Sequence, residues 1–180
     1  MAKGQEQAAP DAVLTRIGQV AMLHHAGDRE EARHRFLGLW AEIGEHGDAL
    51  HRCTLAHYLA DTQDDPAEEL AWDLRALSAA EELTQGPPAD AHEGTSAARA
   101  LYPSLHLNVA ADYDRLGHRE AARLHLGRAR AAARSLAPGR YGEGVRASID
   151  RLEQRLDRAA RDTEGPDRPG GWGRPPRQRP

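Results

Sequence analysis

The chain contains ten histidines, which are the residues with the clearest potential for metal chemistry. A zinc site on a helix needs imidazoles that share one face, as in HExxH, where two histidines are four residues apart. No HExxH and no such histidine pair occurs in the sequence. His24 and His25 are adjacent, so on a helix they point about 100° apart, and His51 and His57 are also poorly spaced for one face. The sequence therefore predicts no metal site and no cofactor.

Acid–histidine pairs are the other candidates for chemistry. On a helix, His57 lies one turn from Asp61, and Asp114 lies one turn from His118. Such pairs are common on helix surfaces, and no GxSxG, phosphate-binding glycine loop or paired-acid motif accompanies them. Cys53 is the only cysteine, which excludes an internal disulfide, and its position on an apolar face predicts a core residue. A histidine-centred hydrolase or metal enzyme is kept only as a second alternative, and the protein is not expected to be an enzyme.

The elements that position these side chains are predicted to be helices. Of the 180 residues, 39% are hydrophobic and only 4% aromatic, so leucine and alanine must form most of the core. A chain rich in Ala, Leu, Arg and Glu favours helix, and no stretch alternates apolar and polar residues as a half-buried strand would. The predicted fold class is all-α, in a single domain.

The sequence also bears on localisation. Its N-terminal segment lacks the apolar core of a signal peptide, and no run of 18 apolar residues occurs. We therefore expect a cytoplasmic protein with no membrane partner.

Capping residues mark several helix starts. Asp11, Asp48 and Asp65 each precede apolar residues at helical spacing, which predicts helices that begin at these positions. Asp28 is followed three residues later by Glu31, which predicts a capping box at the start of another helix.

The segment from Leu105 to Leu136 predicts two helices joined by a tight turn. Small and large residues alternate so that the helices can pack closely, at Ala110, Tyr113, Leu116-Gly117, Ala122, Leu126 and Ala129. This pattern resembles a tetratricopeptide repeat (TPR). Weaker copies of the pattern fall at Gly27, Ala32 and Phe36 and at Leu70, Leu74 and Leu77. The resemblance implies a right-handed α-solenoid of about three TPR-like helix pairs, similar to small TPR proteins of high-GC bacteria.

The repeats define the expected domain organisation. One helical domain is predicted at residues 11–162, with a Gly- and Pro-containing loop inserted at about 84–96, between the second and third repeats. Residues 1–10 and the basic tail at 163–180, which holds Trp172, are predicted to be disordered. A final amphipathic helix that would cap the solenoid is predicted from the apolar seam of Val145, Ile149, Leu152 and Leu156.

In TPR proteins the first helix of each pair lines a concave groove, so the resemblance implies where a ligand would bind. The groove positions are predicted to be His24, His25, His57, Asp61, Ser104, Asn108, Asp114 and Arg115. Asn108 matches a position at which the family often holds a peptide backbone or carboxylate. The predicted function is therefore an interaction module or adaptor that binds a peptide or helix of a partner protein, whose identity the sequence does not give.

Charge is distributed unevenly along the chain and supports an alternative. Residues 28–82 contain 14 acids against 5 arginines, a net of −9, whereas residues 115–161 contain 12 arginines against 5 acids, a net of +7. This polarity suggests a regulatory or sensing subunit whose basic C-terminal half contacts an acidic partner or nucleic acid, or self-association. The overall charge is −4 and no helix-turn-helix occurs, so nucleic acid is not the favoured partner.

Overall fold

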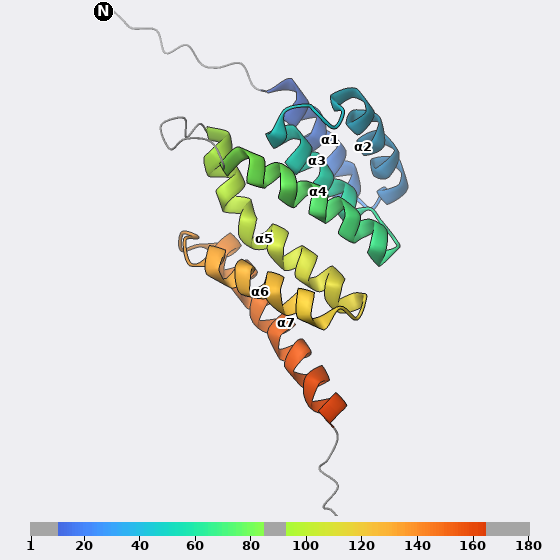
Figure 1. Cartoon of the computed structure of the whole chain (residues 1–180). Helices are drawn as coiled ribbons and strands as arrows, with labels where there is room; N and C mark the ends of the chain where they lie inside the picture. Colours follow the sequence, from blue (N-terminus) through green and yellow to red (C-terminus); the bar gives the residue numbers. More distant parts are fainter. Residues whose placement is uncertain (1–10, 85–92, 165–180) are drawn as a thin grey trace, which may run out of the picture.

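The computed structural model describes residues 11–84 and 93–164, and this part of the chain contains seven helices and no strand. The all-α prediction is confirmed (Figure 1). The predicted disordered ends and most of the predicted loop lie outside the described residues. None of the described helices is long and apolar enough to cross a membrane. The helices are α1 (Ala12–His25), α2 (Arg29–Ile43), α3 (Ala49–Asp61), α4 (Pro66–Thr84), α5 (Glu93–Arg115), α6 (Arg119–Ala133) and α7 (Arg140–Glu164).

Local sequence signals account for three of the seven helix starts in the described part of the chain. The side chain of Asp11 accepts hydrogen bonds from the backbone N–H groups at the start of α1, and Asp48 does the same for α3. Asp65 accepts one from the N–H of Ala67 in the first turn of α4. These bonds satisfy N–H groups that have no partner within the helix, and the three predicted starts are confirmed.

One predicted capping motif and one predicted boundary need correction. Asp28 makes no side-chain capping bond, so the predicted capping box is absent at α2, and Glu31 instead pairs with Arg35 one turn later at 2.7 Å. The predicted loop at 84–96 is shorter, since Thr84 ends α4 and α5 begins at Glu93. Gly86, Pro87 and Pro88 precede the start of α5, whereas Gly94 falls within its first turn, and an acidic residue such as Glu93 is favourable at the positive N-terminal end of a helix.

The helices pack in chain order and also contact their second neighbours. Each helix packs on the next, and in addition α1 contacts α3, α3 contacts α5 and α5 contacts α7 (Figure 1). The odd-numbered helices therefore form a continuous layer. Glycines permit two of the sharp turns, because Gly27 (φ +100°) and Gly117 (φ +79°) adopt the left-handed conformation that a side chain disfavours.

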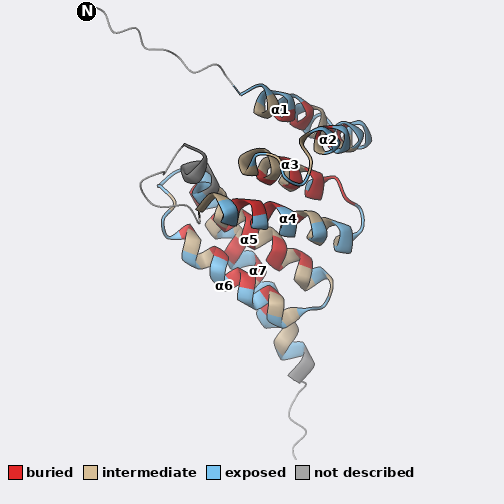
Figure 2. Ribbon diagram, turned by 45° about the horizontal axis from the view of Figure 1, so that its top comes forward, coloured by how far each residue is buried: buried red, intermediate tan, exposed pale blue. Residues whose placement is uncertain are grey.

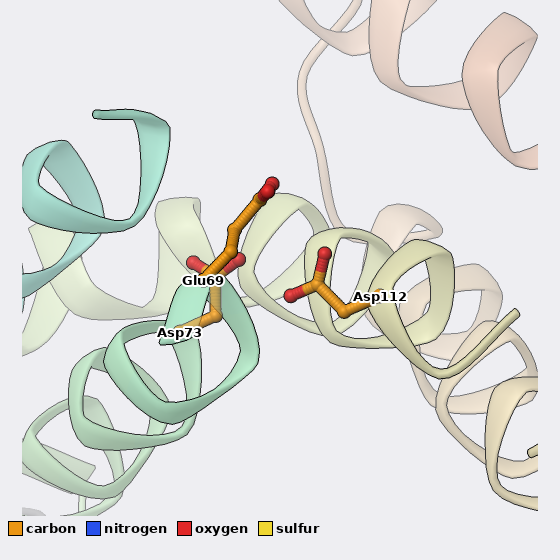
Figure 3. Close-up of side chains that lie close together, drawn as sticks. All are labelled: Glu69, Asp73 and Asp112. Atoms are coloured by element: carbon orange, nitrogen blue, oxygen red, sulfur yellow. The ribbon is translucent and has the colours of Figure 1, made fainter. Parts of the chain in front are cut away.

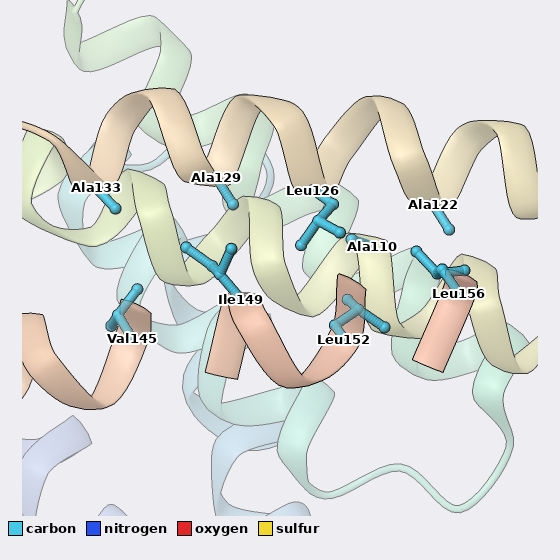
Figure 4. Close-up of a cluster of buried hydrophobic side chains, with 9 residues drawn as sticks. All are labelled: Ala110, Ala122, Leu126, Ala129, Ala133, Val145, Ile149, Leu152 and Leu156. Atoms are coloured by element: carbon cyan, nitrogen blue, oxygen red, sulfur yellow. The ribbon is translucent and has the colours of Figure 1, made fainter. Parts of the chain in front are cut away.

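Three apolar clusters follow one another along the stack. The first joins α1, α2 and α3 around Phe36, and the second joins α3, α4 and α5 around Cys53, which is fully buried as predicted. The third joins α5, α6 and α7 and contains the predicted seam (Figure 4). Alanines occupy many of the positions at which the helices contact one another, and their small side chains let the backbones approach closely. Figure 2 shows that buried residues gather where α3, α4 and α5 face one another.

Candidate functional site

The side chains of His57 on α3 and Asn108 on α5 meet where these two helices contact. Nδ1 of His57 lies 3.5 Å from Nδ2 of Asn108 and 3.9 Å from a carboxylate oxygen of Asp73 on α4. The second distance suits an ion pair but is too long for a hydrogen bond. His57 and Asn108 are half-buried, whereas Asp73 is fully buried. Two residues predicted from the sequence as groove positions are therefore in direct contact.

Three carboxylates gather beside this contact. Glu69 and Asp73 lie one turn apart on α4, and Asp112 lies opposite them on α5 (Figure 3). One oxygen from each residue lies within 4.8 Å of the others. Asp73 is 0% exposed and Asp112 is 1% exposed, so water screens their mutual repulsion poorly. We call Glu69, Asp73 and Asp112 the acidic cluster.

Arg115 partly neutralises the acidic cluster. Its guanidinium pairs with the carboxylate of Glu69 and donates a hydrogen bond of 2.7 Å to Oδ1 of Asp112. These two pairs raise the pKa of Arg115 although burial acts in the opposite direction. The sequence predicted that Arg115 would contact a ligand, but it did not predict this intramolecular role.

The acidic cluster shifts the titration of Asp112. Burial raises the pKa of Asp112 to about 8, and the charges of Asp73 and Glu69 act in the same direction. The physical reason is that an anion removed from water and placed near other anions is unfavourable. The hydrogen bond and the charge of Arg115 oppose this rise without cancelling it. Asp112 is therefore expected to retain its proton near neutral pH.

Charges at the ends of α1 and α3 also act on one another. Burial alone would lower the pKa of His57, but the nearby carboxylates of Asp73 and Asp61 outweigh burial and raise it. Desolvation raises the pKa of Asp61, while the charges of His57, His24 and His25 act to lower it.

The two histidines of α1, together with His57, Asp61 and Asn108, form a polar surface that spans three helices. We call His24, His25, His57, Asp61 and Asn108 the first-helix face.

The two histidines of α1 have different surroundings. His25 is exposed, and its Nδ1 lies 2.6 Å from the carbonyl oxygen of Ala21 in the same helix. His24 is half-buried, and its Nδ1 is buried without a hydrogen-bond partner among the described residues. Their rings are arranged edge to face, with the two ring centroids 5.8 Å apart. Of these two histidines, His24 is therefore the one whose buried ring nitrogen has no hydrogen-bond partner among the described residues.

The remaining predicted groove positions are engaged by α7. The hydroxyl of Ser104 lies 2.7 Å from the hydroxyl of Tyr141, and Arg155 donates a 2.6 Å hydrogen bond to Asp114. Asp114 therefore pairs with Arg155, and the acid–histidine pair with His118 that a hydrolase would need is not formed in the structure. Helix α7 covers this part of α5 and leaves the first-helix face as the region formed by α1, α3 and the centre of α5.

Sequence reasoning missed the acidic cluster. One signal was present, since Glu69 and Asp73 are four residues apart, and like charges at this spacing destabilise a helix unless something compensates them. The third member, Asp112, lies on a helix that only the tertiary structure brings alongside. No local pattern connects the two segments.

A second buried polar pair lies between α5 and α6. Nδ1 of His106 is 3.2 Å from Nδ1 of His125, and both residues are buried. Desolvation, followed by the charge of His125, lowers the pKa of His106 to about 4. The pair is therefore neutral near pH 7, with one imidazole donating to the other.

Several arginines of the basic C-terminal half serve to join α6 and α7. Arg130 pairs with Glu153 at 2.7 Å and with Asp150 at 3.2 Å. Arg146 donates a 2.9 Å hydrogen bond to the carbonyl oxygen of Leu136. These contacts engage, within the protein itself, part of the positive charge that the sequence suggested would attract an acidic partner.

Comparisons with known proteins do not add to this picture. No protein-family model, no curated protein and no solved structure matches the chain. The arrangement of the first-helix face and the acidic cluster must therefore indicate the function. Chemically, this arrangement offers hydrogen-bonding groups for a peptide backbone and negative charge for a cationic group.

Proposed function

We propose that the protein is an interaction module of the TPR type, a right-handed solenoid of about three helix pairs capped by α7. Its first-helix face binds an extended or helical segment of a partner protein. The continuous contacts from α1 to α3 and from α3 to α5 support this proposal, because the first helices of a solenoid line one surface. The function is binding rather than catalysis.

The observation that carries the proposal is the convergence of polar side chains from three helices. His57 and Asn108 are in contact and half-buried, and Asp61 and His24 lie close enough to interact electrostatically. Polar groups held at a helix contact require partners, and the side-chain amide of Asn108 has donor and acceptor capacity beyond its one contact with His57. A peptide backbone supplies both donors and acceptors at such a surface.

The charge of the site favours a basic partner segment. Asp61 and the acidic cluster contribute carboxylates, and the guanidinium of Arg115 is already paired with two of them. A lysine or arginine of the partner placed next to Asp61 would gain a charge-assisted hydrogen bond. The proposed ligand is therefore a peptide segment that carries at least one basic side chain.

Selection from a random peptide library displayed on phage tests this function directly. The enriched peptides should contain lysine or arginine, and they should bind the Asn108→Ala and His57→Ala proteins about tenfold more weakly, the effect of one lost buried hydrogen bond. His34 is exposed on α2, so His34→Ala is a matched control that should bind normally. Peptides that bind all four proteins equally, or a selection without enrichment, would contradict the proposal.

A further inference from the structure

We propose that the acidic cluster is a binding site for one hard divalent cation, such as Mg²⁺, Mn²⁺ or Ca²⁺. The site would lie between α4 and α5, with Glu69 and Asp73 as ligands from one helix and Asp112 from the other (Figure 3). The inference concerns the interior of the helix stack. It does not depend on the proposed peptide-binding function.

The geometry suits such an ion. One carboxylate oxygen from each of the three residues lies within 4.8 Å of the others. Oxygen ligands of Mg²⁺ and Ca²⁺ lie at about 2.0 to 2.6 Å from the ion, so ligands on opposite sides are roughly 4 to 5 Å apart. Three oxygens at these separations can therefore reach a common ion, with water or a neighbouring side chain completing its coordination.

The second observation is that the cluster contains buried carboxylate oxygens without partners. Asp73 is 0% exposed, and neither of its oxygens has a hydrogen-bond partner among the described residues. Oδ2 of Asp112 is likewise buried without one. An ionised carboxylate in this state is strongly unfavourable unless a cation compensates it. Figure 3 shows the Asp73 side chain on the side of α4 that faces α5, with one of its unpartnered oxygens directed toward Asp112.

Charge balance indicates a divalent ion. A bound cation would displace the proton that Asp112 holds near neutral pH, so that the three carboxylates carry three negative charges, and Arg115 supplies one positive charge through its pairs with Glu69 and Asp112. Two negative charges remain, and no arginine among the described residues pairs with Asp73. His57 is the nearest other group, but its Nδ1 is 3.9 Å from Asp73. One divalent cation would balance the site.

The ligand types select the class of ion. Carboxylate oxygens are hard ligands that suit Mg²⁺, Ca²⁺ and Mn²⁺, whereas zinc sites favour cysteine and histidine. Because the ligands come from two helices, a bound ion would also hold α4 and α5 together. Ion binding would therefore stabilise the folded protein.

The test is a titration of metal-free, full-length protein with Mn²⁺, Mg²⁺ and Ca²⁺ separately, followed by calorimetry and thermal unfolding. We expect saturable binding of one ion per chain and a rise in Tm. Asp73→Asn and Asp112→Asn should abolish both effects. Asp157 is exposed on α7, and the Asp157→Asn control should behave like the wild type. Absence of saturable binding for all three ions would overturn the proposal.

A second variant distinguishes the loss of an ion ligand from a failure of the protein to fold. Glu69 is only half-buried, so Glu69→Gln removes a ligand with less disturbance of the core. Weaker binding of the ion by a normally folded Glu69→Gln protein supports the site. Wild-type affinity in this variant and in Asp112→Asn would overturn it, as would a response that Asp157→Asn alone abolishes.

Discussion

Nδ1 of His57 lies 3.5 Å from Nδ2 of Asn108, although the two residues are 51 positions apart in the sequence. This contact joins α3 to α5 at the centre of the first-helix face. Behind it, Asp73 of α4 approaches the same imidazole at 3.9 Å. The contact therefore links the surface that we propose for peptide binding to the buried acidic cluster.

The charge of Asp61 should contribute to partner binding. Asp61 is exposed at the end of α3, where a basic side chain of a peptide can reach it. We expect Asp61→Asn to weaken the binding of a lysine-containing peptide by about 2- to 5-fold, the usual range for an exposed ion pair, and less at high salt. Calorimetry with Asp157→Asn as control measures this effect. Equal affinities for both variants would exclude a role for Asp61.

Removal of the buried charge at position 73 should stabilise the metal-free protein. Asp73 has no hydrogen-bond partner for either oxygen among the described residues, and His57 at 3.9 Å offsets only part of the desolvation penalty of its ionised form. We expect Asp73→Asn to raise the free energy of unfolding by about 1 to 3 kcal/mol. Urea denaturation without divalent cations tests this. A destabilised variant would show that the folded protein compensates the carboxylate in another way.

The metal-free protein should lose stability as the pH rises through the titration of Asp112. Its folded pKa of about 8 lies above the ordinary value of 3.8 for an aspartate, so the folded state binds the proton more tightly than the unfolded state. This contribution is complete at low pH and is lost as the pH rises through the folded pKa. Glu69 and Asp73 face Asp112 from α4, and Arg115 pairs with it from the same helix, α5.

Urea denaturation between pH 6 and pH 9 measures this loss. Asp112→Asn should remove most of the decrease in stability over this range, and saturating divalent cation should do the same in the wild type. An equally steep decrease in the variant would assign the effect to other groups.

The His106–His125 pair should have the opposite pH dependence. The folded pKa of His106, about 4, lies below the ordinary value of 6.5 for a histidine, so the unfolded state binds the proton more tightly. The contribution to stability is complete above the unfolded value and is lost as the pH falls towards the folded one. This contribution alone lowers Tm between pH 6.5 and pH 4, whereas that of Asp112 raises it, so we expect Tm of the His106→Gln protein to fall less, or rise more, than that of the wild type over this range. A parallel profile in the variant would contradict this assignment.

Truncation in the seam of α7 should destabilise the C-terminal part of the stack. Ile149 is 2% exposed and packs among the residues of the third apolar cluster. We expect Ile149→Ala to lower the free energy of unfolding by about 2 to 5 kcal/mol, because it leaves a cavity. Gln154 is exposed on the same helix, so Gln154→Ala should change stability by less than about 0.5 kcal/mol. Chemical denaturation compares the two.

The helices could largely be predicted from the sequence because their signals are local. Capping by Asp48 and Asp65 and the apolar spacing of α7 depend on residues within a few positions of one another. The start of α5 at Glu93 was harder to predict, because a loop predicted from Gly and Pro content does not define where the next helix begins. The side chain of Asp28 shows that a capping motif in the sequence need not form its hydrogen bond.

The candidate site was only partly predictable. The TPR resemblance implied groove positions at His57 and Asn108, and their contact follows from the packing of α3 on α5. The acidic cluster depends on which faces of α4 and α5 meet, and this is decided by packing along the whole length of both helices. The pairing of Arg115 with Glu69 has the same non-local origin.

The most direct test of the binding function is an NMR titration of isotope-labelled protein with a selected lysine-containing peptide. The account predicts that the largest chemical-shift changes fall on His24, His57, Asp61 and Asn108, and that the shifts disappear in the Asn108→Ala protein. Changes concentrated on α6 and α7, or shifts that persist unchanged in Asn108→Ala, would contradict binding at the first-helix face.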